Sequence, residues 1–332
     1  MSKNNIGIEG SIIIAKVLSK NETLKRLNLS RNKIVGIYTF RNEYKGEFSA
    51  EGINALNSAL KVNNTLEYLD ISQNYIGGYT TEVSSSYSSS SSSSSSFSSQ
   101  FKDVLSLIVT ITQFNTSIKS INISGNNFSF ECAREISLLL TEKKHNSCSN
   151  LLTSLIRSEN FNSNFLDLSS KSLRVGDAEF LRYEFSQLVT IVSLDLSYNT
   201  LFGSQGVAAL SDVINSIKHP YPLKQLSLRG ICLYPTQELI HSVGQILLAS
   251  NNKCIVIKDL DLSENKNLFG PESTRQVFYD LKEAIDQVEV MDSLNLSNCN
   301  INSNTAHCVN FKVVGFILYC FFFFTISTFF FL

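Results

Sequence analysis

The sequence predicts an α/β solenoid: a horseshoe with a parallel β-sheet on its concave face and α-helices on its convex face. Three observations lead to this fold class. A nine-residue phrase recurs along the chain, with mostly Leu or Ile at its first, fourth and sixth positions and often Asn at its ninth. Within the phrase, apolar residues alternate with polar ones, as in a strand with one buried side. The stretch after the phrase has the spacing of an amphipathic helix.

The copies of the phrase define the units. The clear copies are Leu24–Asn32, Leu66–Asn74, Ile118–Asn126, Ile191–Asn199 and Ile257–Asn265. Weaker copies begin at Ser163, Leu223 and Met291. The shortest spacing between copies, from position 163 to position 191, is 28 residues. The longer spacings therefore indicate the same unit carrying insertions.

Each phrase is expected to form a strand followed by a turn. In the tripeptide Leu-Asp-Leu at 194–196, both leucines point inward and the aspartate points to the other face. The Asn at the ninth position is expected to turn inward and bond backbone groups of the turn. Lys171, Ile231 and Cys299 stand at that position in three units, so we expect those turns to be bonded differently.

Each strand is expected to be followed by a helix, because apolar residues three or four apart fall on one helix face. Residues that share such a face are Ile53, Leu56 and Leu60 in an early unit, Val207, Leu210 and Val213 in a middle one, and Val277, Leu281 and Ile285 in a late one. A repeated strand and helix gives a parallel sheet with helices on one side. Since no unit can bury its leucines alone, neighbouring units must stack.

This pattern resembles the leucine-rich repeat family, and within it the ribonuclease-inhibitor-like class. That class has units of about 28 residues with a true α-helix on the convex side. The segment Asn4–Gly10, which reads Asn-Asn-Ile-Gly-Ile-Glu-Gly, is typical of the strand-to-helix part of its unit. The resemblance covers roughly residues 4–304. It implies the fold, whereas function must be argued from particular sites.

The array is expected to occupy residues 1–304, with about eight strand-bearing units and a partial unit at the N-terminal end. A serine-rich insertion at 80–100 cannot bury apolar area and is expected to be disordered. It is interpreted either as a tolerated expansion in a loop or as a phosphoacceptor or tether. An insertion at 35–49 should emerge on the same rim. Another, at 143–162, should emerge on the opposite rim.

Beyond a linker at 305–312, the 20 residues 313–332 carry no charge and contain runs of Phe. A helix of that length can span a bilayer, so we expect a C-terminal membrane anchor that leaves the repeats in the cytoplasm. The alternative is a mistaken gene model, because the last unit still lacks its amphipathic helix and runs of Phe resemble translated T-rich noncoding DNA. The polar N-terminus has no apolar signal segment, so secretion is not expected.

Composition and motifs disfavour several classes of function. A net charge of −1, from 28 basic and 29 acidic side chains, gives no attraction to nucleic acid. The seven Cys and four His lack the clustered spacing of a metal site. The sequence contains no phosphate-binding glycine loop and no metalloprotease or serine-hydrolase motif. We therefore expect no enzyme activity, no cofactor and no metal.

One row of the expected sheet is rich in carboxylates. Asp70, Asp167, Asp195 and Asp261 stand at the phrase position that Asn takes in other units. Asp167 and Asp195 would lie on neighbouring strands, about 4.8 Å apart. Each carboxylate would then raise the pKa of the other. The favoured interpretation is that Asp and Asn suit this polar strand position, with catalysis as the alternative.

The concave face offers the best candidate for a binding surface, because exposed aromatic and Arg side chains are frequent in interface hot spots. The candidate partner-binding residues are Arg26, Tyr68, Phe165, Asp195, Tyr198, Lys224 and Arg229. They favour a non-enzymatic scaffold that binds a partner protein whose identity the sequence does not give.

Two other functions follow from the resemblance. Ran GTPase-activating proteins are similar arrays, which makes regulation of a small GTPase the main alternative. Those proteins carry an acidic region after their repeats, and here an apolar tail stands in its place, so no residue is transferred from them. An adaptor for ubiquitin ligases is the third hypothesis, although no F-box-like segment precedes the array.

Overall fold

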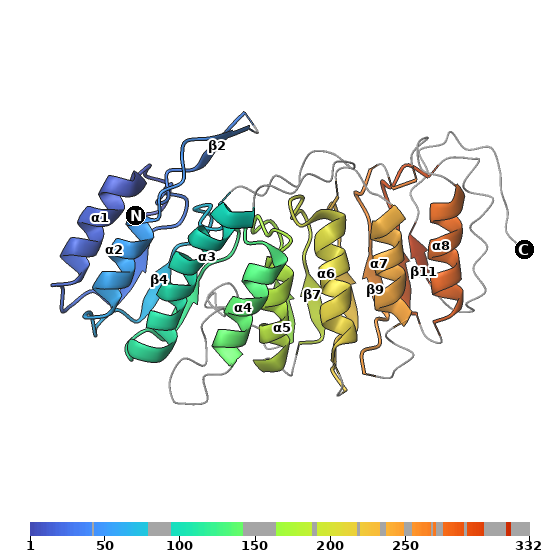
Figure 1. The fold of residues 1–332 in the computed structure, drawn as a ribbon. Coiled ribbons are helices and arrows are strands. Elements are labelled where there is room, and N and C mark those ends of the chain that lie inside the picture. The colour runs from blue at the N-terminus through green and yellow to red at the C-terminus, as the bar shows by residue number, and fades with distance from the viewer. Residues whose placement is uncertain are drawn as a thin grey trace, which may run out of the picture.

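The computed structural model describes residues 1–41, 43–78, 94–141, 164–187, 191–217, 220–232, 237–248, 254–266, 268–269, 275–288, 291–301 and 317–319. Across these ranges the chain forms a solenoid of two layers. Figure 1 shows the helices side by side in one layer, with the strands in a second layer behind them. The helix layer is the convex side of the horseshoe and the sheet layer is its concave side. The predicted fold class is confirmed.

A three-residue strand lies in each of the eight predicted phrases. These strands are β1 (Arg26–Asn28), β4 (Tyr68–Asp70), β5 (Ser120–Asn122), β6 (Phe165–Asp167), β7 (Ser193–Asp195), β8 (Gln225–Ser227), β9 (Asp259–Asp261) and β10 (Ser293–Asn295). All of their pairings are parallel. The middle residue of each strand is Leu or Ile and is buried, as the alternation predicts.

A helix precedes or follows each strand. The helices are α1 (Gly7–Leu18), α2 (Glu51–Leu60), α3 (Ser94–Val109), α4 (Phe130–Thr141), α5 (Asp177–Gln187), α6 (Gly203–Asn215), α7 (Gln237–Leu248) and α8 (Arg275–Asp286). A π-helical turn, Thr110–Phe114, extends α3. The predicted inward face of α6 is buried at Val207, Leu210 and Val213. These side chains pack against strand leucines of the same and neighbouring units, which stabilises the stack.

Asparagines at the ninth phrase position form a buried ladder, as predicted. Its members have no exposed surface: Asn32, Asn74, Asn126, Asn199 and Asn265. The Asn74 amide donates to the carbonyls of Leu29 (2.9 Å) and Ile71 (3.0 Å). Its oxygen accepts the Asn32 backbone N–H at 2.7 Å, and Asn126 accepts that of Asn74 at the same distance. Each amide thus joins two successive turns.

The three units without this Asn are bonded differently, also as predicted. Lys171 is exposed, whereas Ile231 is packed in the apolar core. Cys299 replaces one amide bond with a contact from its Sγ to the carbonyl of Leu262 at 3.1 Å.

The sheet is divided, which the sequence did not predict. β1, β4 and β5 form one sheet, and β6 to β10 form a second, joined by β11 (Ile317–Tyr319). Among the described strands, β5 and β6 are not hydrogen-bonded neighbours. The division coincides with the insertion at 143–162, which lies outside the described residues, and with the ladder break at Lys171.

The first insertion forms an antiparallel hairpin, β2 (Tyr38–Phe40) and β3 (Glu43–Lys45), that projects from the N-terminal end of the array (Figure 1). Of the serine-rich insertion at 80–100, residues up to 93 lie outside the described part of the chain. The remainder is helical, because α3 begins at Ser94. The expected disorder is therefore wrong for residues 94–100, where the serines extend the amphipathic helix that follows them.

The predicted linker at 305–312 lies outside the described residues, as does most of the segment 313–332. Within that segment, Ile317–Tyr319 form the strand β11, which pairs in parallel with β10 and places Leu318 beside Leu294. These three residues therefore continue the sheet and are not part of a helix. In the described part of the chain, no helix has the length and apolarity that a membrane span requires.

Candidate functional site

The concave face of the second sheet carries a shallow hollow of about 260 Å³. Residues of β6 to β10 line it, among them Phe165, Asp195, Asp259 and Asp261. Phe165 is 42% exposed, which is a large fraction for an aromatic side chain on a sheet. Asp259 is held in place, because its carboxylate accepts from Gln225 Nε2 (3.1 Å) and from the Ser293 hydroxyl (2.6 Å).

A row of carboxylates and amides runs across both sheets at the last strand position. Each of these side chains accepts, through Oδ1, the backbone N–H two residues later, at 2.8–3.1 Å. The row consists of Asn28, Asp70, Asn122, Asp167, Asp195, Asp261 and Asn295. Asp and Asn therefore serve here to fix the turn that leaves the strand. This geometry supports the structural interpretation of the row over the catalytic one.

The expected rise in pKa at the neighbouring Asp167 and Asp195 is wrong for Asp167. Partial burial alone would raise the pKa of Asp167. The hydroxyl and the N–H of Ser169, which donate to the carboxylate at 2.6 and 2.9 Å, together with the positive charge of Lys171, outweigh that effect, and the pKa is lowered below its ordinary value. The two aspartates are indeed side by side in the register of β6 and β7.

Tyr198 and Arg229 meet on the rim that follows β7 and β8. The Arg229 guanidinium lies 5.6 Å from the centre of the Tyr198 ring and 3.5 Å from Oε1 of Glu264. The same oxygen accepts from Asn298 Nδ2 at 2.8 Å. Tyr198 remains 47% exposed. The cluster therefore presents an aromatic ring whose neighbours already hold it in position.

The other candidate residues fall in separate places. Lys224 is exposed immediately before β8. On the first sheet, the Arg26 guanidinium lies 4.6 Å from the centre of the Tyr68 ring, and the Tyr68 hydroxyl donates to Asp70 Oδ2 at 3.3 Å. The structure thus brings Phe165, Asp195, Tyr198, Lys224 and Arg229 onto one sheet. Arg26 and Tyr68 lie on the other.

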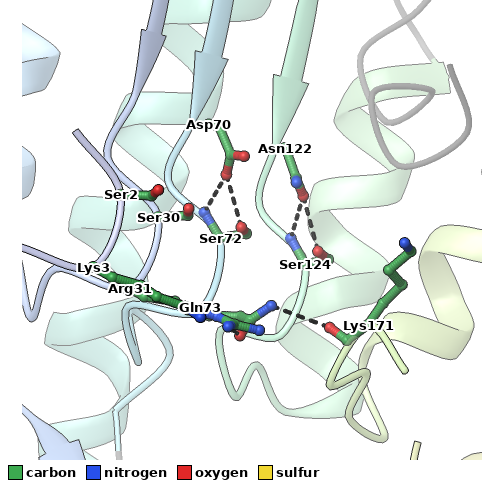
Figure 2. A pocket seen from close by; sticks show the side chains of 10 residues that line it. All are labelled: Ser2, Lys3, Ser30, Arg31, Asp70, Ser72, Gln73, Asn122, Ser124 and Lys171. Carbon is green, nitrogen blue, oxygen red and sulfur yellow. Dashed lines mark hydrogen bonds between the residues drawn. The ribbon is translucent and has the colours of Figure 1, made fainter. Parts of the chain in front are cut away.

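A second hollow, of about 280 Å³, was missed from the sequence. Figure 2 shows Lys3, Arg31 and Gln73 in a row along its edge, with Lys171 on the far side. Arg31 and Gln73 lie in the turns that follow β1 and β4, and Lys3 lies in the turn before α1. All three have a positive φ, between 54° and 58°. Arg31 and Gln73 occupy the same position, the eighth, in their copies of the phrase, so an alignment of the copies could have identified them as neighbours. Lys171 reaches the hollow only because of the way the two sheets meet.

The junction between the two sheets is also built from residues that the sequence analysis passed over. Asp177, at the start of α5, is buried and accepts the N–H groups of Gly125 (3.0 Å) and Arg174 (2.8 Å). The Arg174 guanidinium donates to Asn127 Oδ1 (3.0 Å) and to the Tyr44 hydroxyl in the hairpin (3.2 Å). Burial raises the pKa of Asp177 to about 6, against the opposing effects of these N–H groups and of the Arg174 charge.

No group of three or more metal-ligating side chains comes together among the residues with a described position. Cys132 is a buried residue of α4. Burial, together with the charges of Glu131 and Glu135, raises the pKa of its thiol. A thiol in that state is a poor nucleophile.

Comparison with known families gives one match. A family model described as leucine-rich repeat matches residues 20–36, 62–78 and 187–211. These segments contain β1, β4 and β7 with the turns that follow them. No curated protein matches the chain. The match supports the repeat assignment and leaves the ribonuclease-inhibitor-like class as a resemblance.

Proposed function

The chain is a leucine-rich repeat protein, and on that premise we propose that it is a non-enzymatic scaffold that binds a partner protein on the concave face of its array. Repeats of this family are generally protein-interaction modules. The concave face is a row of parallel strands whose outward side chains differ from unit to unit, while the middle residue of each strand is a buried Leu or Ile and five of the eight units keep the buried Asn. The buried residues therefore maintain the fold, and the exposed residues of the strands are free to vary and to specify a partner.

The observation that carries the proposal is the presence of two exposed aromatic side chains, one on β6 and one in the turn that follows β7. Phe165 and Tyr198 are 42% and 47% exposed, and Arg229 packs against the ring of Tyr198. Aromatic and Arg side chains supply most of the energy in many protein interfaces. Because Glu264 already orders Arg229, less conformational entropy is lost when a partner covers the cluster.

Affinity capture from cell extract with matched variants tests the proposal. Tyr198→Ala removes an exposed ring from the concave side, and Tyr279→Ala removes a ring of similar exposure (49%) from α8 on the convex side. We expect Tyr198→Ala to lose a stoichiometric protein that the wild type and Tyr279→Ala both retain. Equal recovery by all three proteins, or loss with Tyr279→Ala alone, would contradict the proposed surface.

Regulation of a small GTPase stays an untested prediction from the resemblance, and no feature of the described residues favours it over other protein partners. Measurement of GTP hydrolysis by small GTPases with and without the protein addresses it directly. The cytoplasmic location and the membrane anchor at 313–332 likewise stay predictions.

A further inference from the structure

The hollow at the junction of the two sheets has an unbalanced charge. Three cationic side chains line it, from Lys3, Arg31 and Lys171, against the single carboxylate of Asp70 (Figure 2). Within the described residues, none of the three cations makes an ion pair. Arg31 uses its Nε to donate to the side chain of Gln73. Its two terminal nitrogens remain for a ligand.

The one carboxylate already accepts hydrogen bonds at both of its oxygens. Asp70 is 6% exposed, and its Oδ1 accepts the N–H (3.0 Å) and the hydroxyl (2.7 Å) of Ser72. Its Oδ2 accepts from Asn28 Nδ2 (3.2 Å) and from the Tyr68 hydroxyl (3.3 Å). Asp70 therefore belongs to the wall of the hollow and is not available to pair with the cations.

The serine hydroxyls of the wall determine which other hydrogen-bonding groups a ligand needs. Ser30, Ser72 and Ser124 donate inward, to the side chains of Asn28, Asp70 and Asn122, at 2.7–2.8 Å. Their hydrogens are used, so these hydroxyls can offer only lone pairs to a ligand. They stand on three successive units and are spaced as neighbouring strands are, about 4.8 Å apart.

From these groups we propose that the hollow binds an acidic segment of a partner protein. The three cations take carboxylates of the segment, and the partly exposed Ser30 hydroxyl takes an N–H group of its backbone, whereas Ser72 and Ser124 are buried and complete the wall. A free anion would satisfy only the cations, whereas an extended acidic peptide satisfies both sets of groups. The inference rests on the proposed function, because it names the class of partner for the N-terminal part of the same concave face.

The position of the hollow gives such a ligand a second effect. Arg31 and Gln73 belong to the first sheet and Lys171 to the second, and the contact between them is the bond from Gln73 Nε2 to the Lys171 carbonyl at 3.2 Å. An anion held by Arg31 and Lys171 together adds a bridge across the division between β5 and β6. Binding should therefore slow hydrogen exchange at the junction.

Fluorescence anisotropy with a short fluorescein-labelled peptide rich in Glu tests the proposal on the full chain. Arg31→Gln and Lys171→Gln should each weaken binding by roughly tenfold, as expected for loss of one charge-assisted hydrogen bond. Lys16→Gln, an exposed site on α1, makes the same change in charge outside the hollow and should bind as the wild type does. The same peptide with Gln in place of Glu should bind weakly to all four proteins.

Circular dichroism checks that each variant is folded. Equal affinity of wild type and both hollow variants for the Glu peptide would overturn the inference, as would equal binding of the Gln peptide. That failure is distinct from failure of the proposed function, because Tyr198→Ala tests partner capture with a side chain that does not line the hollow.

Discussion

Asp177 makes the stability of the array depend on pH. Its carboxyl is buried between the two sheets, and its pKa of about 6 in the folded protein compares with an ordinary value of 3.8. A raised pKa in the folded state means that the folded protein binds the proton more tightly than the unfolded chain does. The contribution of this group therefore stabilises the fold at low pH and is lost as the pH rises towards 6.

The two pKa values differ by about 2, and each pKa unit corresponds to about 1.4 kcal/mol. The group therefore contributes about 3 kcal/mol in total, and about 2 kcal/mol of this should be lost between pH 4 and pH 6, with the rest lost below and above that interval. Asp177→Asn keeps an oxygen that can accept from Gly125 and Arg174, but it cannot ionise. Relative to the wild type, the variant should become more stable by about 2 kcal/mol over the same interval.

Urea unfolding at pH 4, 5, 6 and 7 measures this difference, because carboxylates common to both proteins cancel in the comparison. Asp167→Asn serves as the matched control. The pKa of Asp167 is lowered, so this group is ionised in both the folded and the unfolded protein over most of the interval. Its substitution should shift stability by a nearly constant amount. A constant difference between Asp177→Asn and the wild type would refute the argument for a buried, protonated carboxyl.

Three further substitutions test the ladder, a tight turn and the junction. Asn74→Ala should cost about 3 kcal/mol in urea unfolding, because it leaves several buried backbone groups without partners; Asn54→Ala, at an exposed site on α2, should change stability by less than about 0.5 kcal/mol. Gly125→Ala should cost about 1 kcal/mol more than Gly203→Ala. Both glycines have positive φ, but a Cβ at Gly125 would approach neighbouring atoms to 2.9 and 3.0 Å, whereas one at Gly203 meets nothing within 4 Å. Arg174→Met should speed hydrogen exchange in the hairpin while leaving that of α7 unchanged, and equal effects on both would contradict a role at the junction.

The repeat phrase could be read from the sequence because its two periods are local. Alternation at 194–196 and helical spacing at 207–214 each depend on residues a few positions apart. The inward Asn could be predicted for the same reason, since its partners lie in its own turn and in the preceding copy of that turn. All eight strands therefore lie where the phrases predict them.

The candidate site was predicted only in part. Phe165 lies on β6 with its side chain exposed, opposite in direction to the buried Leu166. Tyr198 and Arg229 lie in the turns that follow β7 and β8, at the rim of the sheet. The pairing of Arg229 with Tyr198 depends on the packing of two units and not on spacing within one. The lowered pKa of Asp167 depends in part on the hydrogen bond from the Ser169 hydroxyl, which cannot be inferred from the positions of charged residues in the sequence.

By itself the sequence determined the unit, its strand, its helix and its buried face, because each is specified by residues close together in the chain. Only the tertiary structure decided how the units meet. The division between β5 and β6, the burial of Asp177 and the hydrogen bond from Gln73 to Lys171 arise where one irregular unit stacks on its neighbours. Contacts between units join residues that are dozens of positions apart. Because the insertions differ in length, no fixed period in the sequence shows which of these residues come together.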